Sequence, residues 1–496
     1  MLDSKLLKNL QKLDSKTKER FRTFVHSPYF NQHKKTTELL SYLLKHLDGK
    51  PSRLDRNYVF SKLFPGTAYT EQTLFNIMSS LKKLFHRFLA QERYESIPFQ
   101  QDIYLLEACF VKHEFSLLKN RSKNLDKQLE NYTYTDKDYY NIRFKQYKTM
   151  AYYNAVFENR NKTTLFQELN DSLDRYYFVE KLRHSCELTA NMILMNNQYD
   201  LSFLNEVLSF YQKNKSRFVD DPAIRLYYTI LMSLREDENP EHYNQMKMMI
   251  ADEIQLFAPQ DKGNLYSHAN NYCVRQINKG NPAYQKELFE LYQQGLKTGL
   301  IYNNGFLNEW NYKNITVLGC LLKEFDWTIY FLEEYRERLP ADRQENSYNY
   351  NMAHLNYSKQ KYSKALDHLL LVRFSDVKYH LNYNNLLLAT YYALGDIEAL
   401  ISLIDTFRIY VMRNKKITTD QKKQYTNFLR FAKNLVAIKQ LPDSFGRKLK
   451  REKFAHLYLK IQKSSNIVNR YWLEKTCKEE AGNELELLLF EVQEEV

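Results

Sequence analysis

Turn signals recur every 35 to 43 residues through the middle of this chain, each between two stretches whose apolar residues have helical spacing. Their tips fall near Asn161, Asp200, Tyr243, Ala283, Asp326, Lys361 and Asp396. A hairpin of two helices cannot bury its apolar face alone, so hairpins repeated at this period stack on one another. Proline and glycine number only 10 and 11 in 496 residues, which favours helices with short connections. We therefore predict an all-α protein built as an α-solenoid of helix-turn-helix repeats.

Residues 1–97 lack this period and are predicted to form a small basic helical domain, which ends at Ile97-Pro98. The expected helices are Lys16–Val25, Lys34–Leu47, Arg56–Phe64 and Glu71–Tyr94, with caps at Asp55 and Thr70. Apolar residues with 3-4 spacing bury one face of the last helix. Its outer face then carries Gln72, Asn76, Ser79, Lys83 and Arg87.

Residues 98–410 are predicted to be the repeat array, whose first helices are Ile103–Lys119, Asp138–Phe157 and Thr164–Leu182. The clearest repeats lie in 310–410, where SYNYNMAHLNYSKQKYSKALDHLLLV places Ala353 and Ala365 twelve residues apart. Tyr362 follows the turn between them. This pattern resembles the tetratricopeptide repeat (TPR), in which small residues let two helices approach closely. The resemblance implies a right-handed, TPR-like solenoid, and the next unit shifts its alanines to Ala389 and Ala399.

A second resemblance concerns the N-terminal region. HSPYFN at 26–31 and LFPG at 63–66, followed by helical repeats, are similar to segments of an uncharacterised bacterial family with this layout. That resemblance implies a bacterial origin and supplies no function.

Charge separates the parts of the chain. Residues 1–100 hold 18 Lys/Arg and 9 Asp/Glu, and residues 411–473 hold 16 and 3, whereas 101–410 are near neutral. Residues 411–496 are predicted to be basic C-terminal helices, Thr419–Ile438, Ser444–Gln462 and Arg470–Glu480, followed by an acidic capping helix, Glu484–Glu494. Some of this charge is explained by the polar outer face that the end of a solenoid needs.

Several function classes find no support in the sequence. No GxxxxGK[ST], GxGxxG, GxSxG or HExxH motif is present, so we predict no enzyme, no cofactor and no metal. Five dispersed cysteines without a CxxC pair indicate reduced core thiols. The opening lacks the apolar core of a signal peptide and no long apolar run occurs, so we expect a cytoplasmic protein without a membrane partner.

Forty tyrosines are the strongest compositional bias. Tyrosine fills gaps between helices, and it also supplies contact area for a ligand at low entropic cost. The TPR resemblance implies that the inner faces of the first helices line a groove and expose Tyr312, Tyr350, His354, Tyr357, Asn382, Asn385 and Tyr392. The positions of a carboxylate clamp are not matched, so we expect a polar or aromatic ligand rather than an acidic one.

The alternative is nucleic-acid binding. The outer face of 71–94, after a Pro-Gly turn, has the layout of a helix-turn-helix reader, although no strands form a wing. Residues that could contact phosphates or bases are Gln72, Asn76, Ser79, Lys83, Arg87, Lys415, Lys416, Lys422, Lys423, Arg447, Lys448, Lys450 and Arg451, with Tyr425 and Phe428 nearby for stacking. A solvated basic surface explains the same residues.

The sequence thus favours a non-enzymatic protein–protein interaction scaffold that binds a partner segment in a helical-repeat groove. The competing hypothesis is a nucleic-acid-associated regulator in which basic helices contact phosphates and the repeats sense a partner. Neither the partner nor the oligomeric state follows from the sequence.

Overall fold

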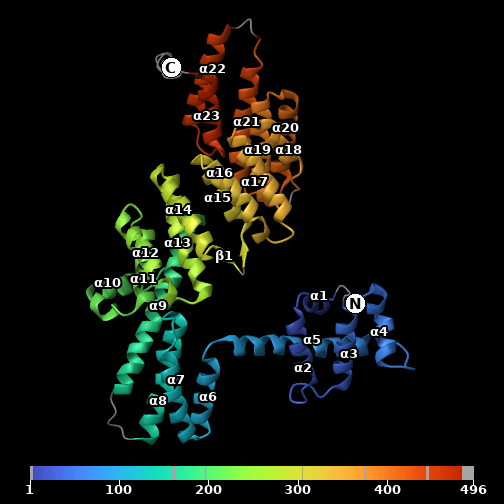
Figure 1. Ribbon diagram of the computed structural model, residues 1–496, viewed down its shortest axis with the longest axis vertical. Coiled ribbons are helices and arrows are strands. Elements are labelled where there is room, and N and C mark those ends of the chain that lie inside the picture. The colour runs from blue at the N-terminus through green and yellow to red at the C-terminus, as the bar shows by residue number, and fades with distance from the viewer. Residues whose placement is uncertain are drawn as a thin grey trace. The chain divides into compact units, whose positions relative to one another are not determined.

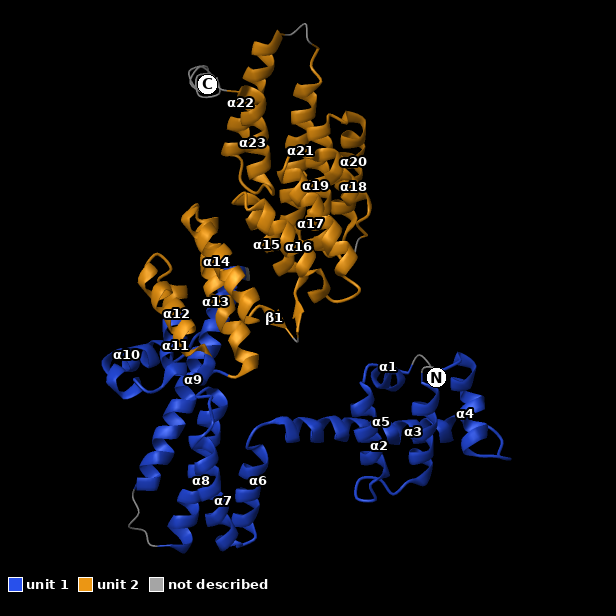
Figure 2. Ribbon diagram, viewed as in Figure 1, with its two compact units in different colours: residues 1–231, 255–257 blue, residues 232–254, 258–496 orange. Residues whose placement is uncertain are grey.

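A computed structural model describes residues 4–47, 49–158, 164–195, 197–303, 305–373, 376–442 and 446–482. Over these ranges the regular structure is helical except for one pair of two-residue strands (Figure 1), which confirms the all-α prediction. The chain divides into two compact units (Figure 2): unit 1 holds residues 1–231 and 255–257, and unit 2 holds 232–254 and 258–496.

The N-terminal part of unit 1 has a core of its own. Its helices are α1 (Lys5–Gln11), α2 (Ser15–His26), α3 (Lys34–His46), η1 (Pro51–Leu54), α4 (Arg56–Leu63) and α5 (Glu71–Ser96). Phe21, Leu39 and Leu81 lie in one buried cluster that runs from Leu6 to Phe88, and no residue beyond Phe88 belongs to it. Asp55 caps α4 as predicted, accepting hydrogen bonds from the Asn57 and Tyr58 backbone.

The remainder of unit 1 departs from the predicted boundaries. Its helices are α6 (Gln100–Val111), α7 (Phe115–Glu130), α8 (Lys137–Phe157), α9 (Thr164–Met195), α10 (Leu204–Lys213), η2 (Lys215–Phe218) and the start of α11 (Pro222–Arg235). The predicted helix Ile103–Lys119 is wrong, because His113 has φ of 60° and the Glu114 N–H donates back to Cys109 O. Neither glycine nor proline marks this break in the sequence. Thr70 also makes no side-chain cap at α5.

Unit 2 begins within α11 and consists of helix pairs. Its elements are α12 (Pro240–Glu253), η3 (Ile254–Leu256, shared with unit 1), α13 (Pro259–Asn278), α14 (Ala283–Thr298), β1 (Tyr302–Asn303), β2 (Phe306–Leu307), α15 (Glu309–Leu321), α16 (Phe325–Glu334), η4 (Arg336–Arg338), α17 (Gln344–Ser358), α18 (Tyr362–Leu370), α19 (Val377–Leu394), α20 (Ile397–Arg413), α21 (Thr419–Lys439), α22 (Gly446–Lys463) and α23 (Arg470–Ala481). From α13 onward each helix packs on the next, and α15, α17 and α19 also pack side by side.

The turn tips are placed well with one exception. Asp200 lies in a loop, Lys361 and Asp396 are the residues before α18 and α20, and Ala283 and Asp326 fall in the first turns of their helices. Tyr243 itself lies inside α12, a few residues after a turn that ends at Asn239. Asn161 and the predicted helix Glu484–Glu494 lie outside the described residues.

The C-terminal helices share a core with the last repeats. Leu388 and Phe407, from α19 and α20, belong to the same buried cluster as Phe428, Phe454 and Leu473 from α21, α22 and α23. The hydrophobic core therefore continues across residue 410, where the sequence placed a boundary. Thr418 and Gln421 close the start of α21 with a reciprocal capping box.

Candidate functional site

The first helices α15, α17 and α19 carry the predicted lining residues of the groove. Asn308 accepts a hydrogen bond from Trp310 N at 2.8 Å and fixes the start of α15. Asp376 does the same for α19 through Tyr379 N, also at 2.8 Å. Gly395, at φ of 75°, ends α19 with the left-handed backbone that glycine adopts at no steric cost.

Three of the predicted lining residues are buried, so their predicted exposure is wrong. Tyr312, Tyr350 and Tyr392 are 0%, 3% and 6% exposed. The Tyr312 hydroxyl donates to Leu332 O of α16 at 2.6 Å, and the Tyr350 ring packs 5.1 Å from that of Tyr379. The rings fill the space between helices because burial of the apolar ring is favourable when the hydroxyl group can still form a hydrogen bond. Burial also raises the pKa of all three phenols.

The C-terminal helix α23 lies against two of the predicted lining residues. The Trp472 indole N–H donates to Tyr357 Oη at 3.1 Å, and the Trp472 ring stands edge-on to Tyr392 with centroids 5.8 Å apart. The Tyr392 hydroxyl donates to Glu480 Oε1 at 2.9 Å, and Lys439 Nζ lies 3.3 Å from the same carboxylate oxygen. This surface of α17 and α19 therefore already holds a polypeptide segment through aromatic and acidic side chains.

His354, Asn382 and Asn385 remain half-buried on α17 and α19. His354 Nδ1 and Asn385 Oδ1 are among the buried side-chain atoms in the described part of the chain that have no hydrogen-bond partner. Burial, with a smaller contribution from the Lys313 charge, lowers the pKa of His354 to about 4, so the imidazole is neutral at pH 7. The Asn385 amide hydrogen-bonds the Tyr425 hydroxyl. We call the side of α15, α17 and α19 that carries Lys313, His354, Tyr357, Asn382 and Asn385 the inner face.

Lys313 and Lys378 are functional candidates that sequence reasoning missed. Their ammonium groups lie 5.6 and 5.0 Å from the centroid of the Trp310 ring. Lys313 is half-buried, and burial together with the charge of Lys378 lowers its pKa. The signal present in the sequence was Trp310-x-x-Lys313, one helical turn on the helix that the TPR resemblance had already assigned to the groove.

Most of the predicted nucleic-acid contacts on α5 are exposed, and some of them have contacts with other side chains. Gln72, Asn76, Lys83 and Arg87 are exposed, but Gln72 Nε2 donates to Asn76 Oδ1 at 2.9 Å. The Arg87 guanidinium lies 5.3 Å from the Phe30 ring centroid. Ser79 lines a pocket of about 700 Å³ together with Lys5, Tyr69, Phe75 and Lys82.

The basic C-terminal residues form two groups, one near the start of α21 and one beyond its end, at the start of α22. Lys415 and Lys416 precede α21, and Lys422 and Lys423 lie in its first turns. Arg447, Lys448, Lys450 and Arg451 begin α22, which follows the other end of α21. Because α21 spans 21 residues at about 1.5 Å each, the two groups are roughly 30 Å apart. Tyr425 and Phe428 are buried, at 8% and 0% exposure, so their proposed role in stacking is wrong.

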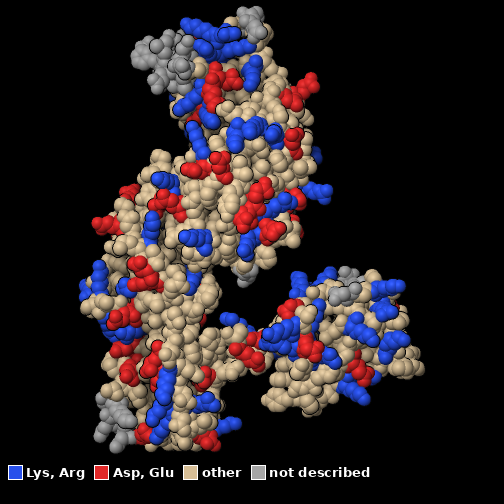
Figure 3. All heavy atoms as spheres, in the orientation of Figure 1, with Lys and Arg blue, Asp and Glu red and all other residues tan. Residues whose placement is uncertain are grey.

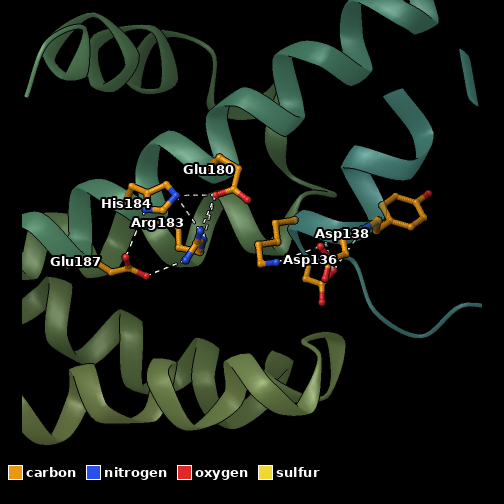
Figure 4. A network of polar contacts seen from close by, with 8 residues as sticks. Asp136, Asp138, Glu180, Arg183, His184 and Glu187 are labelled. Atoms are coloured by element: carbon orange, nitrogen blue, oxygen red, sulfur yellow. Dashed lines mark hydrogen bonds and ion pairs between the residues drawn. The ribbon is translucent and has the colours of Figure 1, made fainter. Parts of the chain in front are cut away.

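Other charged networks have a structural explanation. On α9, Arg183 donates to Glu180 and Glu187 at 2.8 Å each, and His184 lies 3.2 Å from Glu180 (Figure 4). These side chains follow one helix at the i, i+3 and i, i+4 spacing that stabilises helices. In Figure 3, basic and acidic side chains are mixed over most of the visible face, with a run of basic ones where α22 begins. No described helix is both long and apolar enough to cross a bilayer.

No protein-family model, curated protein or solved structure matches this chain. The TPR resemblance therefore rests on the residues themselves, and function has to be argued from the inner face.

Proposed function

We propose that this protein is a non-enzymatic, cytoplasmic interaction scaffold that binds a segment of a partner protein on the inner face of unit 2. The observation that carries the proposal is the seating of α23. Trp472 and Glu480 contact Tyr357 and Tyr392 through one indole hydrogen bond and one carboxylate hydrogen bond. A surface that holds one amphipathic segment in this way is suited to hold another beside it.

The unpartnered polar atoms support the same proposal. His354 Nδ1 and Asn385 Oδ1 are buried without a hydrogen bond, and a buried polar group left unpaired costs about 1–3 kcal/mol. A partner segment would remove this cost if side chains of α17 and α19 move on docking and let it bond to these atoms. We interpret α15 to α20 as divergent TPR-like units of a right-handed solenoid, whose rigid helices lower the entropic cost of docking.

A second candidate function, nucleic-acid binding, is favoured by the exposed basic residues Lys415, Lys416, Lys423 and Arg447. Such residues give an affinity that falls steeply with salt because counterions are released on binding. Partner binding on the half-buried inner face should survive moderate salt.

Two variants of the full chain test the scaffold function. N382W places a bulky side chain on the inner face at a half-buried position, and K364W places the same side chain at an exposed position of α18. A partner captured from the native host, with and without nuclease, is purified and its affinity for each variant is measured by calorimetry. We expect at least about tenfold weaker binding to N382W and unchanged binding to K364W. Equal affinity for both variants, or capture that nuclease abolishes, would refute the scaffold.

A further inference from the structure

The Lys313 side chain is half-buried, and no acidic side chain pairs with its ammonium group among the described residues. Within the described residues no carboxylate lies within ion-pair distance of its ammonium group, and its closest recorded electrostatic contact is the Trp310 ring. Burying a charge without a counter-charge is costly. A cation over an aromatic face recovers about 0.5–2 kcal/mol, less than a hydrogen-bonded carboxylate supplies.

Lys378 adds a second positive charge at the same ring. It comes from α19, whereas Trp310 and Lys313 come from α15, so the cluster forms where residues of the two helices meet at the Trp310 ring. Burial lowers the pKa of Lys313, and the positive charge of Lys378 lowers it further. His354 of α17 lies close enough to be affected, because the charge of Lys313 adds to the effect of burial in lowering the pKa of His354.

The acidic residues in this region are already engaged. Glu309 Oε2 lies 3.6 Å from Arg343 Nη1, and Asp376 caps the first turn of α19. Neither has a recorded ion pair with Lys313 or Lys378. In the cluster of Trp310, Lys313, His354 and Lys378, which we call the lysine cluster, neither ammonium group therefore forms an ion pair with a carboxylate of the described residues.

We propose that the inner face recognises an acidic peptide segment carrying an aromatic residue, with a carboxylate of that segment bound by Lys313 and Lys378 beside Trp310. The segment belongs to a partner protein, and the inference rests on the proposed scaffold function. The chain provides its own precedent on the same helices, because α23 uses an indole and the Glu480 carboxylate to hold Tyr357 and Tyr392. This revises the expectation of a polar or aromatic ligand without acidic character.

The test uses the full chain and a fluorescein-labelled peptide of alternating Glu and Tyr, with a second peptide in which Gln replaces every Glu. Fluorescence anisotropy is measured for the wild type, for K313Q/K378Q, and for the control K361Q/K364Q, which removes two exposed lysines outside the inner face. We expect the Glu peptide to bind at least about tenfold more weakly to K313Q/K378Q, because two charge-assisted contacts are lost. The control should match the wild type, and the Gln peptide should bind all three equally weakly.

Four outcomes would overturn the proposal. The first is equal binding of the Glu peptide to K313Q/K378Q and to the wild type, and the second is equal affinity of the Glu and Gln peptides. The third is tighter binding after all glutamates of residues 484–495 are changed to glutamine, which would make this chain's own acidic segment the occupant. The fourth is tighter binding of a single-stranded oligonucleotide with the same lysine dependence.

Failure here differs from failure of the scaffold function. A captured partner that loses affinity for N382W but not for K313Q/K378Q leaves the scaffold standing and removes only the acidic recognition. A captured partner that binds N382W normally removes the scaffold itself.

Discussion

The substitution Gly319→Ala tests the close packing of α15 on α16. A Cβ at this position would overlap Oγ1 of Thr328 and come within 3.4 Å of Phe289 Cε2. Thr328 is fully buried, and its hydroxyl donates to Glu324 O at 2.6 Å. Relief requires either a shift of α16 or rotation of Thr328 with loss of this hydrogen bond. Overpacking costs about 1–3 kcal/mol and the lost bond about 1 kcal/mol, against about 1 kcal/mol gained because alanine favours a helix more than glycine.

We expect G319A to lower the free energy of unfolding of unit 2 by about 1–3 kcal/mol. The assay is urea unfolding followed by tryptophan fluorescence, which reports unit 2 because Trp310, Trp327 and Trp472 all lie there. In a T328A background the obstructing hydroxyl is absent, so G319A should become neutral or slightly stabilising. Equal losses of stability in both backgrounds would show no coupling between the two positions and would refute the reasoning.

Three further predictions concern buried polar groups. Asp221 is 5% exposed, and its carboxylate lies 2.8 Å from Tyr140 Oη and 3.1 Å from Arg175 Nε. D221A should therefore lower the local stability of α8 and α9 by about 2–3 kcal/mol, which is measured as faster amide hydrogen exchange in these helices. Unchanged exchange would contradict this prediction. The folded pKa of His354, about 4, lies below its ordinary value of 6.5, so the unfolded chain binds the proton first and stability falls as pH drops from 6.5 toward 4. The urea midpoint of H354N should therefore fall less between pH 7 and pH 5 than that of the wild type. The difference in unfolding free energy between the two proteins should change by up to about 1.4 kcal/mol per pH unit. Parallel plots of urea midpoint against pH would contradict this prediction. All five cysteines are buried, and burial raises the pKa of Cys273 and Cys320 to about 11. Ellman's reagent should therefore react with these thiols only after the protein unfolds. Rapid reaction of the native protein would contradict this prediction.

Local signals in the sequence placed several helices of this protein, among them α2 to α5, α8 and α21 to α23. Asp55, Asp396 and Thr418 cap helices because each side chain satisfies backbone N–H groups within its own turn. Such contacts depend only on neighbouring residues, so a sequence pattern found the cap at Asp55, although the same kind of pattern was wrong at Thr70, which makes no side-chain cap. The break at His113 has no such pattern, because its positive φ occurs at a residue that seldom adopts it.

The candidate site was less accessible to sequence reasoning because it depends on contacts between distant segments. Whether Tyr312 is exposed depends on α16, and the surroundings of Tyr357 depend on Trp472, 115 residues further along the chain. The pairing of Lys313 with Lys378 likewise requires residues of α15 and α19 to meet at the Trp310 ring. The sequence identified the helices that carry the site, and the structure decided which of their side chains remain accessible.

Hydrogen–deuterium exchange of the full chain, with and without the captured partner, tests the central claim most directly. The scaffold function predicts slower exchange in residues 344–358 and 377–394, which form α17 and α19, and unchanged exchange in residues 71–96 of α5. Protection confined to α5 or to the start of α22, with none in α17 and α19, would contradict it.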